Sequence, residues 1–172
     1  MEIKYLVIHH TAISRQVNPD QFDSVNQYHR EKWDFKSSLG FYGGYHYMMS
    51  ADGIIKQFRA EDEEAAAVIG HNNDSLHICL SGNFDIEEPT TNQRHNLRLW
   101  IQEKMKKYNI PSKNVRGHRF FTVKSCPGVN LTDFELKIMA ESEREIIIKK
   151  IGILQQLVIA YEAILRILKL KK

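Results

Sequence analysis

A run of β-branched and aromatic residues near the start of the chain, Tyr5-Leu-Val-Ile-His-His10, limits the possible folds more than any other segment. It is mostly apolar, which is typical of a central strand buried on both faces of a sheet. Side chains alternate between the two faces of a strand, so His9 lies with Val7 on one face and His10 lies on the other. We therefore do not expect the two adjacent histidines to share one metal ion.

Further patterns place helices between strands. Asn18-Pro19 offers an N-cap and a first-turn proline for a helix, and Asp52-Gly53 predicts the turn of a hairpin. Thr90 and Gln93 form a capping-box pattern. It precedes a helical apolar stripe that consists of Leu97, Trp100, Ile101, Met105 and Tyr108.

Strands are also expected at 76–80 and 114–118, and a short helix is expected after Thr132. Strands interleaved with helices predict an α/β fold. We expect a central mixed β-sheet flanked by helices, followed by a long C-terminal amphipathic helix.

With 172 residues, the chain is long enough for one hydrophobic core and too short for two comfortable domains. The net charge of +3 lies entirely in residues 141–172, which carry seven basic and four acidic side chains, whereas residues 1–140 carry 17 of each. This neutral main part gives no electrostatic footprint for nucleic acid.

The chain has two cysteines, Cys79 and Cys126, which are fewer than a secreted disulfide scaffold of this size would carry. Cys79 is interpreted as a small buried hydrophobic residue. The N-terminus runs straight into the first strand pattern and lacks the features of a signal peptide. We therefore expect synthesis in the cytoplasm.

The composition changes at about Glu141. Apolar residues spaced alternately four and three apart form a heptad seam of Ile147, Ile151, Leu154, Val158, Tyr161, Leu165 and Leu168. Additional apolar residues widen this stripe, and Gln155, Gln156, Glu162 and Arg166 weigh against a transmembrane span. We expect residues 141–172 to form an amphipathic helical tail that follows a main domain at 1–140. Oligomerisation, membrane contact and packing back on the main domain remain open for it.

Three separated residues suggest a metal site. His9 ends the first strand, and His118 and Cys126 lie eight residues apart near a strand end. Zinc takes such N and S ligands, and three protein ligands with an open fourth position are typical of a catalytic site. Taken alone, His9 would more often be a packed histidine, and Cys126 an inert thiol in a surface turn. Lys124 would favour a thiolate beside it.

Five motifs carry a resemblance to a known family. They are Val7-Ile-His-His-Thr-Ala12, Gly44-Tyr-His-Tyr47, Asp74-Ser-Leu-His-Ile-Cys-Leu-Ser-Gly-Asn-Phe84, Arg116-Gly-His118 and Lys124-Ser-Cys-Pro127. In order and spacing they resemble the phage-lysozyme type of N-acetylmuramoyl-L-alanine amidase. This type 2 amidase family also contains the peptidoglycan recognition proteins. The resemblance covers about residues 1–138.

The resemblance implies a zinc site in a surface groove, with His9, His118 and Cys126 as ligands, and a catalytic tyrosine and lysine at Tyr45 and Lys124. It implies hydrolysis of the amide between N-acetylmuramic acid and L-alanine of peptidoglycan. Cytoplasmic recycling amidases use an aspartate in place of Cys126, so the cysteine favours the lytic, endolysin branch, which acts on the bacterial cell wall after release.

The chain also departs from the family pattern. Ala67 stands where many relatives carry a groove histidine, and His77 stands where glycine is common. Whether His71 or His77 compensates for the missing histidine or packs is left open. Two other functions compete: a non-catalytic peptidoglycan-binding protein on the same fold, and an assembly or membrane module acting through residues 141–172.

Overall fold

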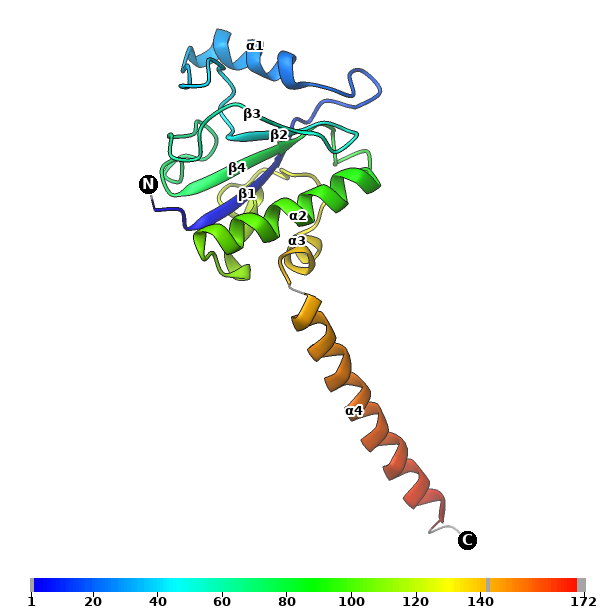
Figure 1. Cartoon of the computed structure of the whole chain (residues 1–172). Helices are drawn as coiled ribbons and strands as arrows, with labels where there is room; N and C mark the ends of the chain where they lie inside the picture. Colours follow the sequence, from blue (N-terminus) through cyan, green and yellow to red (C-terminus); the bar gives the residue numbers. More distant parts are fainter. Residues whose placement is uncertain (1, 142, 170–172) are drawn as a thin grey trace. The chain divides into compact units, whose positions relative to one another are not determined.

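The computed structural model describes residues 2–141 and 143–169. The chain divides into two compact units, Met1–Ala140 and Glu141–Lys172. In the first unit the elements follow one another along the chain (Figure 1) as β1 Tyr5–His10, α1 Phe22–Trp33, β2 Tyr47–Met49, β3 Ile55–Gln57, β4 Ser75–Leu80, α2 Thr91–Tyr108, η1 Ser112–Asn114, β5 Val115–Gly117, η2 His118–Phe120 and α3 Asp133–Ala140.

One five-stranded sheet organises this unit, in the order β3-β2-β4-β1-β5. Strand β1 is parallel to both β4 and β5, and β2 is parallel to β4. Strands β2 and β3 form the antiparallel hairpin that Asp52-Gly53 predicts. The α/β prediction with a central mixed sheet is therefore confirmed.

Helices cover both faces of the sheet (Figure 1). Helices α2 and α3 pack on one face, and their core includes Leu6, Ile8, Ile78, Leu97 and Ile101, all fully buried. Helix α2 begins at the capping box predicted for Thr90 and Gln93, with both reciprocal hydrogen bonds present.

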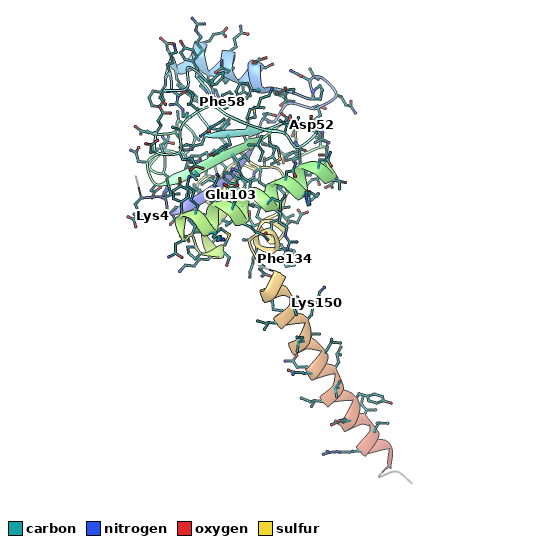
Figure 2. The ribbon with its side chains drawn as sticks, viewed as in Figure 1. Lys4, Asp52, Phe58, Glu103, Phe134 and Lys150 are labelled. Carbon is teal, nitrogen blue, oxygen red and sulfur yellow. The ribbon has the colours of Figure 1, made fainter. Side chains whose placement is uncertain are left out.

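Helix α1 covers the other face, over a smaller apolar cluster. Phe22 and Val25 of α1 pack there on Met48 of β2 and on Phe58, which Figure 2 shows on the α1 side of the sheet. The rings of Phe22 and Phe58 stack with centroids 4.0 Å apart. The odd-numbered residues of β1 and β4 lie on this face of the sheet, the one that α1 covers.

The predicted start of α1 at Asn18-Pro19 is wrong, because the helix begins at Phe22. Gln21 is fully buried, and its side-chain amide donates to the carbonyl oxygens of Ile13 and Asn18. Asn18 instead accepts a hydrogen bond from the backbone of Asp20. Because Gln21 is drawn inward, residues 18–21 form a turn and not a first helical turn.

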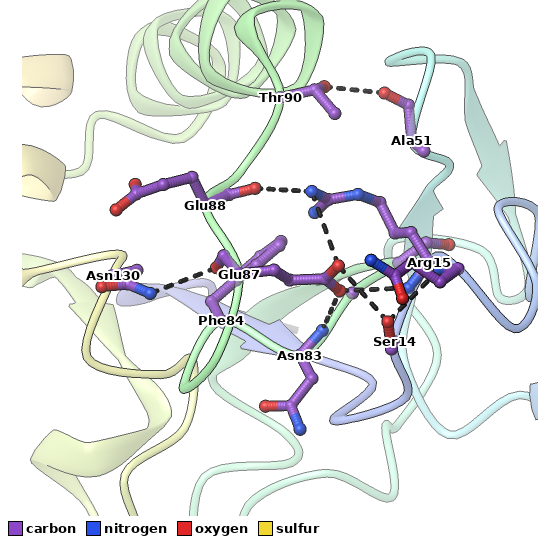
Figure 3. Close-up of polar contacts among 12 residues, drawn as sticks. Ser14, Arg15, Ala51, Asn83, Phe84, Glu87, Glu88, Thr90 and Asn130 are labelled. Atoms are coloured by element: carbon purple, nitrogen blue, oxygen red, sulfur yellow. Dashed lines mark hydrogen bonds and ion pairs between the residues drawn. The ribbon is translucent and has the colours of Figure 1, made fainter.

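Loops at the carboxyl ends of β1 and β4 are joined by a polar network (Figure 3). The Glu87 carboxylate accepts hydrogen bonds from the backbone N–H groups of Arg15 and Asn83, at 3.1 and 2.7 Å. The Arg15 guanidinium donates to the carbonyl oxygen of Glu88 at 2.7 Å. This network fixes the loops at the end of the sheet where β1 finishes with His9 and His10.

The second unit contains helix α4, Glu143–Lys169. Its apolar side chains between residues 147 and 165 are exposed, with fractional exposures from 37% to 66%. Those lying on the heptad seam are Ile147, Ile151, Leu154, Val158, Tyr161 and Leu165; Leu168 lies outside the residues whose side chains are described. Within the described ranges, no helix has the length and hydropathy needed to cross a bilayer.

Candidate metal centre

The two histidines that end β1 point to opposite faces of the sheet, as the period of two predicts. His10 lies on the α2 side, where its Nδ1 accepts a hydrogen bond from the backbone N–H of Phe84 at 3.1 Å. His9 lies on the α1 side and is 1% exposed. Its ring centroid is 4.9 Å from that of Tyr45 and 4.6 Å from that of His118. Only His9 is therefore placed to meet His118 and Cys126.

Three ligand-type side chains converge at this point, and we call His9, His118 and Cys126 the His–His–Cys cluster. Their ligand atoms all lie within 4.8 Å of one another. Cys126 Sγ is 3.9 Å from His9 Nδ1. Zinc bonds of about 2.1 Å to nitrogen and 2.3 Å to sulfur would place two tetrahedral ligand atoms about 3.6 Å apart. The cluster thus fits one zinc ion after a small adjustment.

A close approach of two segments brings Cys126 to His118. Gly117 is the last residue of β5, and a β-carbon there would lie 2.7 Å from the Pro127 ring. The backbone N–H of Arg119 donates to the carbonyl oxygen of Cys126 at 2.6 Å. Glycine at position 117 therefore lets the cysteine loop pack directly on the strand that carries His118.

The cysteine loop is also tied to the loop after β4. The Ser125 hydroxyl donates to one oxygen of the Asp85 carboxylate at 2.8 Å, and the Val129 N–H donates to the other at 3.1 Å. The Ser125 hydrogen bond is the main reason why the pKa of Asp85 is lowered. Because both flanks of the loop are held, Cys126 has little freedom to leave the cluster.

The protonation states of the two histidines in the cluster also suit metal binding. Burial lowers the pKa of His9 well below its ordinary value, and burial followed by the charge of Lys124 lowers that of His118. Neutral imidazoles offer the lone pairs that a metal needs. Burial raises the pKa of the Cys126 thiol to about 11. The hydrogen bond from the His10 backbone and the charges of Arg119 and Lys124 oppose this rise without cancelling it, so a metal cation would be needed to hold a thiolate.

Tyr45 lies in the loop two residues before β2. The Tyr45 hydroxyl hydrogen-bonds the Cys79 thiol, and burial raises its pKa well above the ordinary value. The neighbouring backbone is fixed because the N–H of Gly44 donates to His29 Nδ1 at 2.8 Å. Tyr45 is therefore a half-buried neutral phenol beside His9.

Lys124 is exposed in the loop between His118 and Cys126, where its backbone N–H donates to the Thr122 hydroxyl at 3.0 Å. Its ammonium group acts on the pKa of both His118 and Cys126. The lysine thus places a positive charge near His118 and Cys126.

The structure gives His71 and His77 different surroundings. His71 packs between the rings of Tyr5 and Phe121, with centroids 5.4 and 4.6 Å away, and pairs with Asp74 at 3.1 Å. His77 reaches the cluster itself, because its Nδ1 is 3.1 Å from His9 Nε2. Sequence reasoning did not anticipate this contact. The one available sequence signal was the period of two, which places His77 and Cys79 on the same face of their strand.

Fold and site together define a class of protein: an α/β protein with a three-ligand candidate metal centre of mixed nitrogen and sulfur donors near the carboxyl end of β1. Residues 1–129 match the family model described as N-acetylmuramoyl-L-alanine amidase. This match covers most of the chain. The chain belongs to the N-acetylmuramoyl-L-alanine amidase family.

Individual relatives agree with this membership. Peptidoglycan-recognition protein 2 of Holotrichia diomphalia is 30% identical over 95 residues, which are 53% of this chain and 48% of that protein. The endolysin of Escherichia phage T7 is 28% identical over 93 residues, 51% of this chain and 60% of the endolysin. The match thus spans about half the length of the first relative and less than two thirds of the second.

A solved structure shows the same fold. The N-acetylmuramoyl-L-alanine amidase LysC from Clostridium intestinale superposes with a TM-score of 0.68 and 27% sequence identity, covering 80% of this chain and 85% of that one. The resemblance to amidases of the endolysin type is therefore confirmed at the level of family and fold.

Proposed function

We propose that this protein is a zinc-dependent peptidoglycan hydrolase that cleaves the amide bond between N-acetylmuramic acid and L-alanine. The observation that carries the proposal is the convergence of the ligand atoms of His9, His118 and Cys126 within 4.8 Å. Membership of the amidase family and similarity to phage endolysins support the reaction and the substrate class.

In this proposal His9, His118 and Cys126 would hold the zinc ion, a three-ligand set that is typical of catalytic zinc sites. Zinc bound there would supply a Lewis acid and lower the pKa of a bound water toward about 7. Burial keeps the two imidazoles neutral, and the tied cysteine loop holds the thiolate in place. The protein thus contributes a preorganised donor set.

Tyr45 and Lys124 are the proposed catalytic side chains. The Lys124 ammonium is exposed beside the cluster and stabilises the negative charge that develops on the carbonyl oxygen of the substrate. Tyr45 offers a neutral hydroxyl at a position fixed by the backbone around Gly44, and orients the attacking water or relays a proton to the leaving amine.

The competing function is peptidoglycan binding without catalysis, because the relatives include peptidoglycan-recognition proteins. The presence of both Tyr45 and Cys126 favours the enzyme, since a pure binding site requires neither. For residues 141–172 we propose an accessory role through the exposed apolar seam of α4, in self-association or in contact with a membrane.

One experiment separates the enzyme from the binding protein. Zinc content and solubilisation of purified peptidoglycan are measured for the wild type, Cys126→Ser and His10→Ala. The proposal predicts one zinc per chain and peptide release for the wild type and His10→Ala, and loss of both for Cys126→Ser. Full zinc occupancy in Cys126→Ser, or peptidoglycan binding by zinc-loaded wild type without release, would contradict it.

A further inference from the structure

Each ring nitrogen of His9 has a different neighbour. Nδ1 faces the His–His–Cys cluster, 3.9 Å from Cys126 Sγ, and Nε2 faces His77 Nδ1 at 3.1 Å. A metal ligand needs a bare lone pair, so His9 can serve only if its proton is on Nε2. The partner of Nε2 therefore determines whether His9 is ready to bind.

The partners of His77 determine where that proton lies. His77 Nε2 is 3.4 Å from the carbonyl oxygen of His71, which can only accept a hydrogen bond, so Nε2 of His77 carries a hydrogen. His77 is fully buried, and among the described residues no carboxylate hydrogen-bonds to it. A charged imidazolium would be costly there. Neutral His77 thus has a bare Nδ1, and the proton between the two rings belongs to His9.

The position of His77 is itself fixed by a second buried histidine. The backbone N–H of His77 donates to His46 Nδ1 at 3.1 Å, and the backbone N–H of His46 donates to the carbonyl oxygen of His77 at the same distance. His46 Nε2 in turn donates to the carbonyl oxygen of Glu63 at 3.0 Å. The two rings stack with an interplanar angle of 5°. His77 therefore has little freedom to turn away from His9.

We propose that His77 is a positioning residue that holds His9 in the Nε2–H tautomer, so that His9 Nδ1 presents its lone pair to the metal. The inference rests on the proposed zinc site and deepens it. Metal-bound histidines commonly donate their second N–H to a carboxylate, a carbonyl or water, and loss of that partner typically lowers metal affinity about 10–100-fold. Here a second imidazole takes that role.

The first test uses the metal-free wild type. Long-range ¹H–¹⁵N NMR correlations distinguish a protonated from a bare imidazole nitrogen, and Cys126→Ser and His9→Gln assign the His9 signals. We expect His9 with hydrogen on Nε2 and none on Nδ1, and His77 in the same tautomer. Hydrogen on His9 Nδ1 would overturn the proposal, whether or not the protein binds zinc.

The second test compares zinc affinity in His77→Asn and His77→Leu, measured by competition with a chromophoric chelator. Asparagine places its carbonyl oxygen close to the position of Nδ1, whereas leucine places a methyl group there. We expect about 10–100-fold weaker binding in His77→Leu, with most of the affinity retained in His77→Asn.

His10→Leu is the matched control. His10 is also buried and its ring also accepts a hydrogen bond, but it lies on the opposite face of the sheet. His10→Leu therefore measures how much general destabilisation alone lowers zinc affinity. Zinc affinity in His77→Leu within about threefold of the His10→Leu value would overturn the positioning role. Absence of zinc binding in the wild type would refute the proposed function instead. Should His77→Leu fail to fold, the NMR result on the wild type decides.

Discussion

Gly128 lies directly against the backbone of Phe84. A β-carbon at position 128 would approach the Phe84 carbonyl oxygen to 2.6 Å, and φ of Gly128 is +103°. This contact joins the loop that carries Cys126 to the loop after β4, and the Asn130 N–H donates to the same carbonyl oxygen at 2.8 Å. The position of the loop that carries Cys126 thus depends on the absence of a side chain at residue 128.

Gly128→Ala should therefore weaken both the fold and zinc binding. Overlap with Phe84 adds about 1–3 kcal/mol to the cost of the positive φ. Gly70→Ala is the control, because Gly70 has φ of +82° with nothing near its β-carbon and carries only the conformational cost, about 1–2 kcal/mol. Chemical denaturation and zinc titration measure the difference. Equal losses in the two variants would contradict the packing argument.

The pKa of Glu61 lets us predict how the stability of the first unit changes at low pH. Burial alone would raise its pKa, but hydrogen bonds from Lys104, Lys107, Tyr108 and Tyr47 bring it to about 2. A carboxyl group with a lowered folded-state pKa stabilises the fold above its unfolded pKa, and that stability is lost as pH falls toward the folded value.

We expect Glu61 to contribute about 2–3 kcal/mol of unfolding free energy at pH 6, and this contribution should vanish between about pH 4.5 and 2. Glu61→Gln should start less stable than the wild type and lose less on acidification. Urea denaturation at each pH measures both proteins. Parallel pH curves for the two would show that Glu61 is not the group responsible.

Tyr45→Phe and Lys124→Ala should keep the fold and the zinc ion but lose most activity. Loss of one group that stabilises the transition state typically costs about 10²–10³ in turnover. The readouts are zinc content and the rate of peptide release. Lys113→Ala is the matched control for Lys124→Ala, since Lys113 is an exposed lysine that precedes β5, whereas His118 follows the other end of that strand. A Tyr45→Phe variant with wild-type turnover would remove Tyr45 from the mechanism.

A chain ending at Ala140 should remain folded, bind zinc and cleave purified peptidoglycan. The reason is that the core residues of the described part of the chain lie between Ile3 and Ala140, whereas the described apolar side chains of the α4 seam are exposed. Light scattering and binding to anionic vesicles then show what residues 141–172 add. A drop in mass indicates self-association, and lost vesicle binding indicates membrane contact. An insoluble or zinc-free truncated chain would contradict the separation into two units.

The sequence predicts the parts of the fold that depend on local chemistry. The β1 pattern, the Asp52-Gly53 turn and the Thr90 capping box all appear in the structure. The predicted start of α1 was wrong because the Gln21 side chain is drawn inward by the Ile13 carbonyl oxygen, which lies eight residues before it. Local propensity does not contain such information.

The candidate site likewise has parts that the sequence predicts and a part that it does not. Period two correctly separates His9 from His10, and the motifs name all three members of the His–His–Cys cluster. The role of His77 was not predictable, because it depends on strand register. Parallel pairing of β1 with β4 places Val7 opposite His77 and His9 opposite Cys79, which brings the His77 ring diagonally to His9. Only the assembled sheet provides that register.

The most direct test of the account identifies the products of purified peptidoglycan. The metal-stripped protein is assayed before and after one equivalent of zinc is added, and new amino termini and new reducing sugar ends are measured together. The account predicts zinc-dependent release of peptides with N-terminal L-alanine and intact glycan strands. New reducing ends, or release of the same peptides without metal, would contradict it.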